Sequence, residues 1–125
     1  MTTNRVMIAG SGGQGIVLMG KLLAYAAMEE GKEVTFYPSY GAEMRGGTAN
    51  CSVIISDHPI SSPVVHKADI VVAMNQPSFV KYESSVEPGG SLFMNSTLIE
   101  TQVTRTDIEV HKVDANKLAE DVGIG

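Results

Sequence analysis

The chain has 125 residues and a formal net charge of −5, from nine Lys and Arg residues against fourteen Asp and Glu residues. No run of basic residues occurs, so the sequence does not indicate a nucleic-acid-binding protein or a helix that lies on a membrane surface. The single cysteine, Cys51, can form neither a disulfide within the chain nor a cysteine-ligated iron–sulfur cluster. Because no signal-peptide pattern or membrane-length apolar run is present, we expect a cytoplasmic protein.

The first motif is a glycine-rich turn between an apolar strand, residues 5–9, and a helix expected over residues 14–30. Glycine permits positive φ and lets a ligand approach the backbone, and the N–H groups at a helix start attract an anion. A GxGxxG pattern between a strand and a helix is typical of a phosphate-binding turn. The candidate binding residues here are Gly10, Ser11, Gly12, Gly13, Gln14 and Gly15.

The helix that follows has an apolar face at helical spacing, made of Ile16, Met19, Leu23 and Ala27. Gly20 lies on this face and would permit close packing against a sheet, and Gly31 is a plausible C-cap. Residues 34–37 predict a second strand, which completes a βαβ unit with a right-handed crossover.

A polar, glycine-punctuated loop then runs from Pro38 to Thr48, and compact domains seldom keep so long a loop without a function. If the first two strands are neighbours, this loop meets the glycine turn at the carboxyl edge of the sheet, where ligands bind. Arg45 has a fork of donors suited to phosphate or carboxylate, and Glu43 could orient it or contact a partner. In the alternative interpretation both side chains are simply solvated. The candidate residues of this loop are Tyr40, Glu43, Arg45, Gly46, Gly47 and Thr48.

The remaining pattern alternates strands and helices. Further strands are predicted at residues 49–56, 69–74, 91–95 and 108–113, a helix capped by Asn75 at 75–85, an antiparallel edge at Ile60, and a last helix from Ala115. This order predicts an α/β, Rossmann-like, doubly wound and mostly parallel sheet that can carry an antiparallel edge strand. Because the last helix has barely begun at Gly125, we expect one domain over residues 1–125 that is truncated at its C-terminus.

A stand-alone NAD(P)- or flavin-binding oxidoreductase is the first interpretation to test. A dinucleotide-binding unit usually ends its second strand with an Asp or Glu that binds the adenine ribose. Here the residues from Val34 to Ser39 hold no acid, and Glu43 lies beyond them. The fingerprint is therefore present at its phosphate end only, which makes this interpretation a less favoured alternative.

Other reactive residues point to no catalytic site. Cys51 is expected to be a buried structural thiol, and His58, His66 and His111 lack metal-ligand spacing and are expected at the surface. Asn95, at a strand end, could line the ligand-binding crevice at the carboxyl edge of the sheet, or it could simply form a turn. Since no nucleophile–base pair or pair of carboxylates can be assembled, we expect no catalytic residue and no metal ligand, which favours a subunit over a self-sufficient enzyme.

Two stretches together resemble the gamma subunit of the 2-oxoacid:ferredoxin oxidoreductases: the turn 10–15 and the segment Tyr40-Gly-Ala-Glu-Met-Arg-Gly-Gly-Thr-Ala-Asn-Cys51. Residues 69–74 and 88–92 fit the same pattern, and the resemblance covers nearly the whole chain. The sequence is most similar to the 2-oxoglutarate and ketoisovalerate types, and it does not exclude the pyruvate or indolepyruvate types.

The resemblance implies a complex that decarboxylates a 2-oxoacid oxidatively, transfers the acyl group to coenzyme A and passes electrons to ferredoxin. It implies that thiamine diphosphate, magnesium and iron–sulfur clusters lie on companion alpha, beta and ferredoxin-like delta subunits, and that gamma domains are longer than this chain. We therefore expect a subunit that is inactive by itself and helps to hold an anion, with the coenzyme A phosphates as the leading candidate. A pure assembly subunit is the competing alternative.

Overall fold

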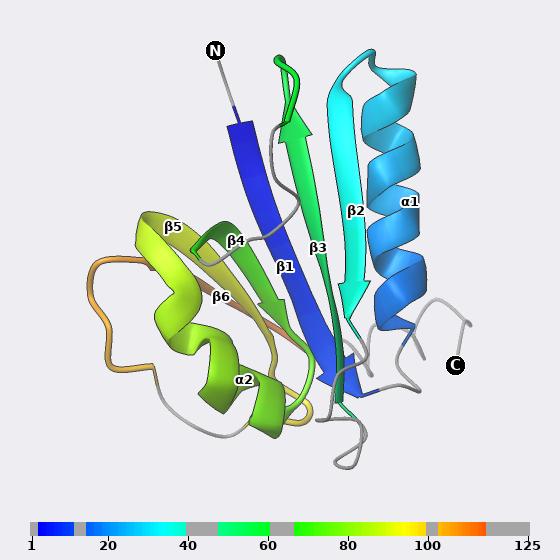
Figure 1. The fold of residues 1–125 in the computed structure, drawn as a ribbon. Coiled ribbons are helices and arrows are strands. Elements are labelled where there is room, and N and C mark those ends of the chain that lie inside the picture. Colours follow the sequence, from blue (N-terminus) through cyan, green and yellow to red (C-terminus); the bar gives the residue numbers. More distant parts are fainter. Residues whose placement is uncertain (1–2, 12–14, 40–47, 61–66, 100–102, 115–125) are drawn as a thin grey trace.

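The protein is described by a computed structural model over residues 3–11, 15–39, 48–60, 67–99 and 103–114. Within these ranges, six strands form one sheet in the order β2-β3-β1-β4-β5-β6, and two α-helices pack on it (Figure 1). In chain order the elements are β1 (Thr3–Ser11), α1 (Ile16–Glu29), β2 (Glu33–Ser39), β3 (Thr48–Ser56), β4 (Ala68–Ala73), α2 (Gln76–Tyr82), the 3₁₀ turn η3 (Glu83–Ser85), β5 (Val86–Asn95) and β6 (Glu109–Val113).

The sheet confirms the predicted α/β class and corrects its strand order. The pairs β1–β4, β4–β5 and β5–β6 are parallel, whereas β3 runs antiparallel to both β1 and β2. The first two strands are therefore not neighbours, because β3 lies between them. Ile60, the expected antiparallel edge, is not in a strand. The antiparallel edge strand of the sheet is β2, which pairs with β3. The side chains of β3 are buried on both faces of the sheet, as Val53 and Ile54 show, and this explains the interior position of β3.

Alternate residues of β1 separate the core into two layers, as the twofold side-chain period of a strand requires. Val6 and Ile8 pack with Ile16 of α1, whereas Met7 packs on the other face with Phe79 of α2. Helices thus cover both faces of the sheet, which is the doubly wound arrangement that the sequence predicts.

The C-terminal end of α1 is closed by Gly31, as predicted. The Gly31 N–H donates to the Met28 carbonyl at 3.0 Å and the Lys32 N–H donates to the Ala27 carbonyl at 3.2 Å. With a φ of 79° at Gly31, these two bonds form a Schellman motif, which a residue without Cβ adopts at low cost.

The packing of α1 on the sheet depends on Gly20 and Cys51. A Cβ at Gly20 would lie 2.4 Å from the Cys51 Sγ and 2.9 Å from Cε1 of Phe36, so only glycine fits there without displacement. The Cys51 side chain is fully buried, and its thiol donates to the Ile16 carbonyl at 3.5 Å. Burial raises the pKa of Cys51 from 9.0 to about 11, against a smaller lowering by a backbone hydrogen bond at Gly20. The prediction of a structural thiol is confirmed.

The second half of the chain matches the prediction in part. Asn75 caps α2 by accepting from the Ser78 N–H at 3.0 Å, and η3 extends the helical segment as far as Ser85. The strand predicted from Ser91 begins at Val86 instead. Val86 pairs with Ala68 of β4, and a register shift after Ala68 accommodates the Pro-Gly-Gly sequence that indicated a turn.

The polar segment before β6 is held by Arg105. Its guanidinium donates to the carbonyls of Glu83 at 3.1 Å and Val86 at 2.8 Å, and it pairs with the Asp107 carboxylate through two nitrogen–oxygen contacts. The hydrogen bond with Asp107 raises the pKa of Arg105, and the same bond lowers the pKa of Asp107. Arg105 therefore has a structural role at the start of β5.

Replacement of Gly20 by alanine is expected to destabilise the protein. The new methyl group meets the Cys51 sulfur, and such overpacking costs about 1–3 kcal/mol, which outweighs the roughly 1 kcal/mol by which alanine is the better helix former. Urea unfolding measures the change. In a Cys51→Ala background the loss should shrink, and Gly20→Ala proteins as stable as the parent would contradict this packing.

The buried thiol also predicts a pH dependence. Because the pKa of Cys51 is higher in the folded protein than in the unfolded chain, its contribution to the free energy of unfolding is complete below pH 9.0 and is lost as the pH rises through about 11. Cys51→Ala protein should lack this part of the alkaline loss of stability. If the parent and Cys51→Ala proteins lose the same free energy of unfolding at alkaline pH, measured by urea unfolding, then folding does not raise the pKa of the thiol.

Candidate anion-binding site

The candidate site lies at the carboxyl edge of the sheet, where β1 ends and β3 begins. Gly10 pairs with Ala49 and Ser11 pairs with Thr48 in the antiparallel ladder between these strands. Ser39, the last residue of β2, pairs with Asn50 of β3. Thr48, at the end of the long loop, thus lies next to β1, the strand that leads into the glycine turn, whereas Ser39, before the loop, lies on the far side of β3 (Figure 1).

Some of the predicted site residues can be placed and others cannot. The structure brings Gly10, Ser11, Gly15 and Thr48 to this edge. The others lie outside the described residues, and they are Gly12, Gly13, Gln14, Tyr40, Glu43, Arg45, Gly46 and Gly47.

Gly15 forms the start of α1. It is the N-cap residue with φ 70° and ψ 29°, in the left-handed region, and its carbonyl accepts from the Met19 N–H at 2.9 Å. No side chain of the described residues caps this helix, and its first turn carries no acidic residue. The N–H groups of the first turn and the positive end of the helix dipole therefore meet no negative side chain in α1 itself, an arrangement that suits an anionic ligand.

Two asparagines stabilise the strand ends around the site. The Asn50 amide donates to the Tyr82 hydroxyl at 2.8 Å and so ties β3 to α2. Asn95 is 2% exposed, donates to the Met74 carbonyl at 3.2 Å and accepts from the Thr97 N–H at 3.2 Å. Asn95 is thus a turn residue rather than one that lines a crevice. The sequence pattern does not predict the Asn50–Tyr82 contact. Its signal in the sequence is that Asn50 is a polar residue in an otherwise apolar strand.

The described ion pairs lie at the opposite edge of the sheet. Lys32 pairs with Asp57 there, and hydrogen bonding to that carboxylate, the largest cause, raises the pKa of Lys32. The Arg5 backbone N–H donates to the Asp69 carboxylate at 2.8 Å, which joins the starts of β1 and β4. These charges therefore connect elements far from the glycine turn.

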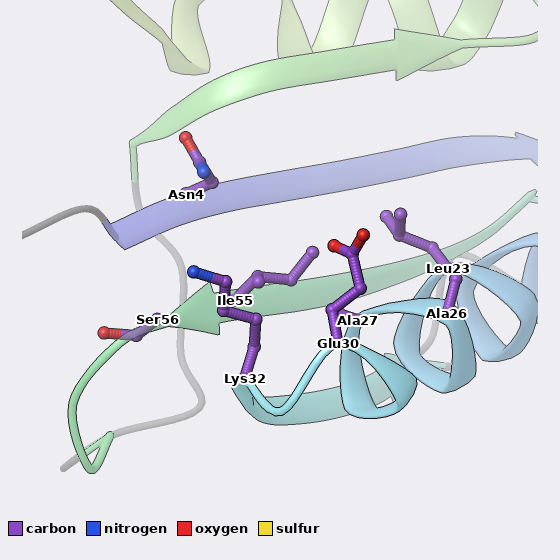
Figure 2. A pocket seen from close by; sticks show the side chains of 8 residues that line it. All are labelled: Asn4, Leu23, Ala26, Ala27, Glu30, Lys32, Ile55 and Ser56. Carbon is purple, nitrogen blue, oxygen red and sulfur yellow. The ribbon is translucent and has the colours of Figure 1, made fainter.

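A hollow of about 380 Å³ also lies away from the candidate site, beside the C-terminal half of α1 (Figure 2). Apolar side chains and the charged Glu30 and Lys32 surround it, and its full lining is Asn4, Leu23, Ala26, Ala27, Glu30, Lys32, Ile55 and Ser56. The Ser56 hydroxyl is already engaged with the Thr3 hydroxyl at 2.9 Å and the His58 N–H at 3.1 Å. The hollow shares no residue with the predicted anion site.

The histidines do not form a site in the described part of the chain. His111 is exposed and stacks on Phe93 with ring centroids 4.6 Å apart, His58 is half-buried, and His66 lies outside the described residues. Among the residues described, no three His, Cys, Asp or Glu side chains lie close enough together to hold a metal ion. In the same residues, no helix has the length and apolar character needed to cross a membrane.

The chain is similar to several known proteins. Residues 5–125 match the family model described as pyruvate ferredoxin/flavodoxin oxidoreductase. The ketoisovalerate oxidoreductase subunit VorA of Methanothermobacter thermautotrophicus is 48% identical over 93 residues, which cover 74% of this chain and 20% of that protein. The 2-oxoglutarate synthase subunit KorC of Methanocaldococcus jannaschii is 36% identical over 118 residues, which cover 93% of this chain and 63% of that protein.

A solved structure extends the likeness to the fold. The gamma subunit of a keto/oxoacid ferredoxin oxidoreductase from Geobacter sulfurreducens superposes with a TM-score of 0.83 and 31% identity, over 98% of this chain and 67% of that one. The chain thus spans about a fifth of the VorA relative and less than two thirds of the KorC relative. Since the family match extends from β1 to the last residue and the fold agrees, the chain belongs to the pyruvate ferredoxin/flavodoxin oxidoreductase family.

Proposed function

We propose that the chain is the gamma component of a multi-subunit 2-oxoacid:ferredoxin oxidoreductase, and that its glycine turn and the following long loop hold an anionic ligand of that complex. Family membership supports the first part. The companion alpha, beta and ferredoxin-like delta subunits would hold thiamine diphosphate, magnesium and the iron–sulfur clusters. This chain would supply no catalytic nucleophile or base.

The observation that carries the binding role is the pairing of Ser11 with Thr48. Neighbouring strands of a sheet lie about 4.8 Å apart, so this pair brings Ser11 of the glycine turn next to Thr48, the last residue of the loop. The described residues of the two segments that carry the family resemblance thus lie side by side at Gly10–Ala49 and Ser11–Thr48.

The leading ligand is coenzyme A, which carries several phosphates. Backbone N–H groups from Gly12 to Gly15 would bind one phosphate in the way that glycine-rich helix starts bind anions. Arg45 would bind a second phosphate, or the carboxylate of the 2-oxoacid, through its fork of donors. The start of α1, where no described side chain caps the helix, supports the first of these contacts.

The strand order argues against the alternative of a stand-alone dinucleotide enzyme. In such enzymes the second strand lies beside the first, so that an acid at its end reaches the ribose. Here β3 separates β2 from β1, and β2 ends with Tyr37, Pro38 and Ser39. Both the position and the residue type therefore disagree with ribose recognition.

Substitution of Arg45 by alanine in the complete complex is expected to weaken the binding of coenzyme A by about 10- to 100-fold, because a hydrogen bond between charged groups contributes roughly 1.5–3 kcal/mol. Arg45→Lys should retain part of the affinity, since it keeps the charge and loses the fork. Isothermal titration calorimetry measures coenzyme A and the 2-oxoacid separately, which distinguishes the two anions.

The matched control is Arg5→Ala, which removes an exposed arginine at the opposite edge of the sheet and should leave both affinities unchanged. Unchanged binding of both ligands to an intact Arg45→Ala complex would refute the role of Arg45. Loss of the companion subunits from that variant, seen by size-exclusion chromatography, would favour the assembly alternative.

Replacement of Gly15 by alanine separates backbone strain from ligand binding. Gly15 and Gly31 both have positive φ and no atom within 4 Å of an added Cβ, so either substitution should cost about 1–2 kcal/mol of stability through strain alone. Only Gly15→Ala should also weaken coenzyme A binding, because Gly31 lies at the far end of α1. Equal affinities in the two variants would count against the turn as the phosphate site.

A further inference from the structure

The α1 side of the sheet is only partly covered by the described part of the chain. On this side α1 packs against β1, β2 and β3, and on the other side α2 packs against β1 and β4 (Figure 1). The side chains of β4 and β5 on the α2 side are fully buried, as Val71 and Leu92 show. On the α1 side, by contrast, the apolar side chains of Ile70, Val72 and Phe93 are only half-buried.

A half-open face is unusual for strands of this kind. β4 lies between β1 and β5, both of which run parallel to it, and β5 lies between β4 and β6 in the same way. Parallel strands inside a sheet occur almost only where helices cover both faces. The hollow of Figure 2, which is lined by Leu23 of α1 and Asn4 of β1, lies on this same side, so α1 does not fill it even as far as the start of β1. A second helix is therefore expected beside α1, over β4 and β5.

The chain that leaves β6 is well placed to supply this helix. The Val113 carbonyl accepts from the Ser96 N–H at 2.8 Å, which holds the end of β6 beside the end of β5. The Asp114 carboxylate accepts from the Thr97 hydroxyl, which fixes the first residue after β6 at the same edge of the sheet. On the α2 side, the segment between β5 and β6 already packs on the core through Ile99. The chain after Asp114 therefore meets its open apolar surface on the α1 side.

We propose that residues 115–125, which lie outside the described residues, form a helix whose apolar face covers β4 and β5 on the α1 side. The apolar residues of this segment have the i, i+3, i+4, i+7 spacing of a helix with one apolar face, and they are Ala115, Leu118, Ala119 and Val122. Eight helical residues rise about 12 Å, which is close to the roughly 13 Å that extended chain spans from Ile70 to Met74. The family match extends through residue 125, so the segment belongs to the same domain.

This cover is independent of the proposed anion site and goes beyond it. Its contacts lie on β4 and β5, whereas the glycine turn connects β1 to α1. The tests use thiol chemistry without any ligand, so the cover and the anion site can fail separately. A helix of a companion subunit is the competing occupant of the same face.

The first test measures how well Val72 is covered in the complete protein that carries this chain. A Val72→Cys thiol should react slowly with N-ethylmaleimide. Adding Leu118→Asp should raise that rate by about tenfold or more, because the helix then no longer protects the face. Lys117→Asp is the matched control, since position 117 lies opposite the apolar face of the helix, and it should leave the rate unchanged.

The buried thiol of Cys51 reports in the same experiment whether the fold is intact. Its labelling should stay negligible in every variant. Fast labelling of Val72→Cys without Leu118→Asp, or the same slow rate with and without it, overturns the proposal. If Leu118→Asp also exposes Cys51, the protein has unfolded as a whole, and cross-linking then decides.

Cross-linking identifies the chain that supplies the helix. Leu118→Cys, combined with either Val72→Cys or Phe93→Cys, should form a disulfide within one chain under mild oxidation, because the three positions share one contact. Leu118→Cys combined with Val80→Cys should form none, since Val80 is 67% exposed on α2, at the other face of the sheet. The absence of a disulfide within one chain at both Val72 and Phe93 overturns the proposal and leaves the face to a companion subunit.

Discussion

The insertion of β3 between β1 and β2 is the constraint on which the structure depends. β3 pairs with β1 over nine residues and with β2 over seven, so it attaches the β2 edge to the rest of the sheet. Side chains of β3 contribute to both core layers, with Val53 on the α1 face and Ile54 on the α2 face. The same strand carries Cys51 to the position against which Gly20 of α1 packs closely.

This strand also connects the fold to the proposed function. The segment Tyr40–Cys51, which carries the family resemblance, includes the first residues of β3. Because β3 runs antiparallel to β1, its beginning lies beside the end of β1, and Thr48 pairs with Ser11. If β2 lay beside β1 as a parallel strand, the end of β2 would lie beside the end of β1. The antiparallel β3 instead places Thr48, near the end of the family motif, beside Ser11.

Local features could be predicted from the sequence, and long-range pairing could not. The length of α1, its buried face, the Gly31 cap and the Asn75 cap follow from residues a few positions apart, which is the range over which helix signals act. The position of β3 depends on pairing with strands on both sides and has no local signature. The early start of β5 has the same origin, because pairing with β4 overrode the turn signal of Pro88-Gly89-Gly90.

The end of β1 and the start of α1 could be predicted from the sequence, because strand ends and glycine turns leave clear patterns. Gly10, Ser11 and Thr48 lie at the carboxyl edge of the sheet, and Gly15 starts α1, while the binding role of these residues stays a prediction. The role of Arg105 could not be predicted, since its partners are carbonyl groups of η3 and β5 more than fifteen residues away. The role of a single charged residue in a polar segment depends on the partner that the fold places next to it.

One measurement tests the central claim most directly, namely that the turn and the loop form one anion site. It is a crystal structure of the complete complex with coenzyme A bound. The account predicts a phosphate within hydrogen-bond distance of backbone N–H groups between Gly12 and Gly15, with Arg45 on the same ligand or on the 2-oxoacid carboxylate. A partner side chain packed into the turn, with coenzyme A bound elsewhere, would contradict it.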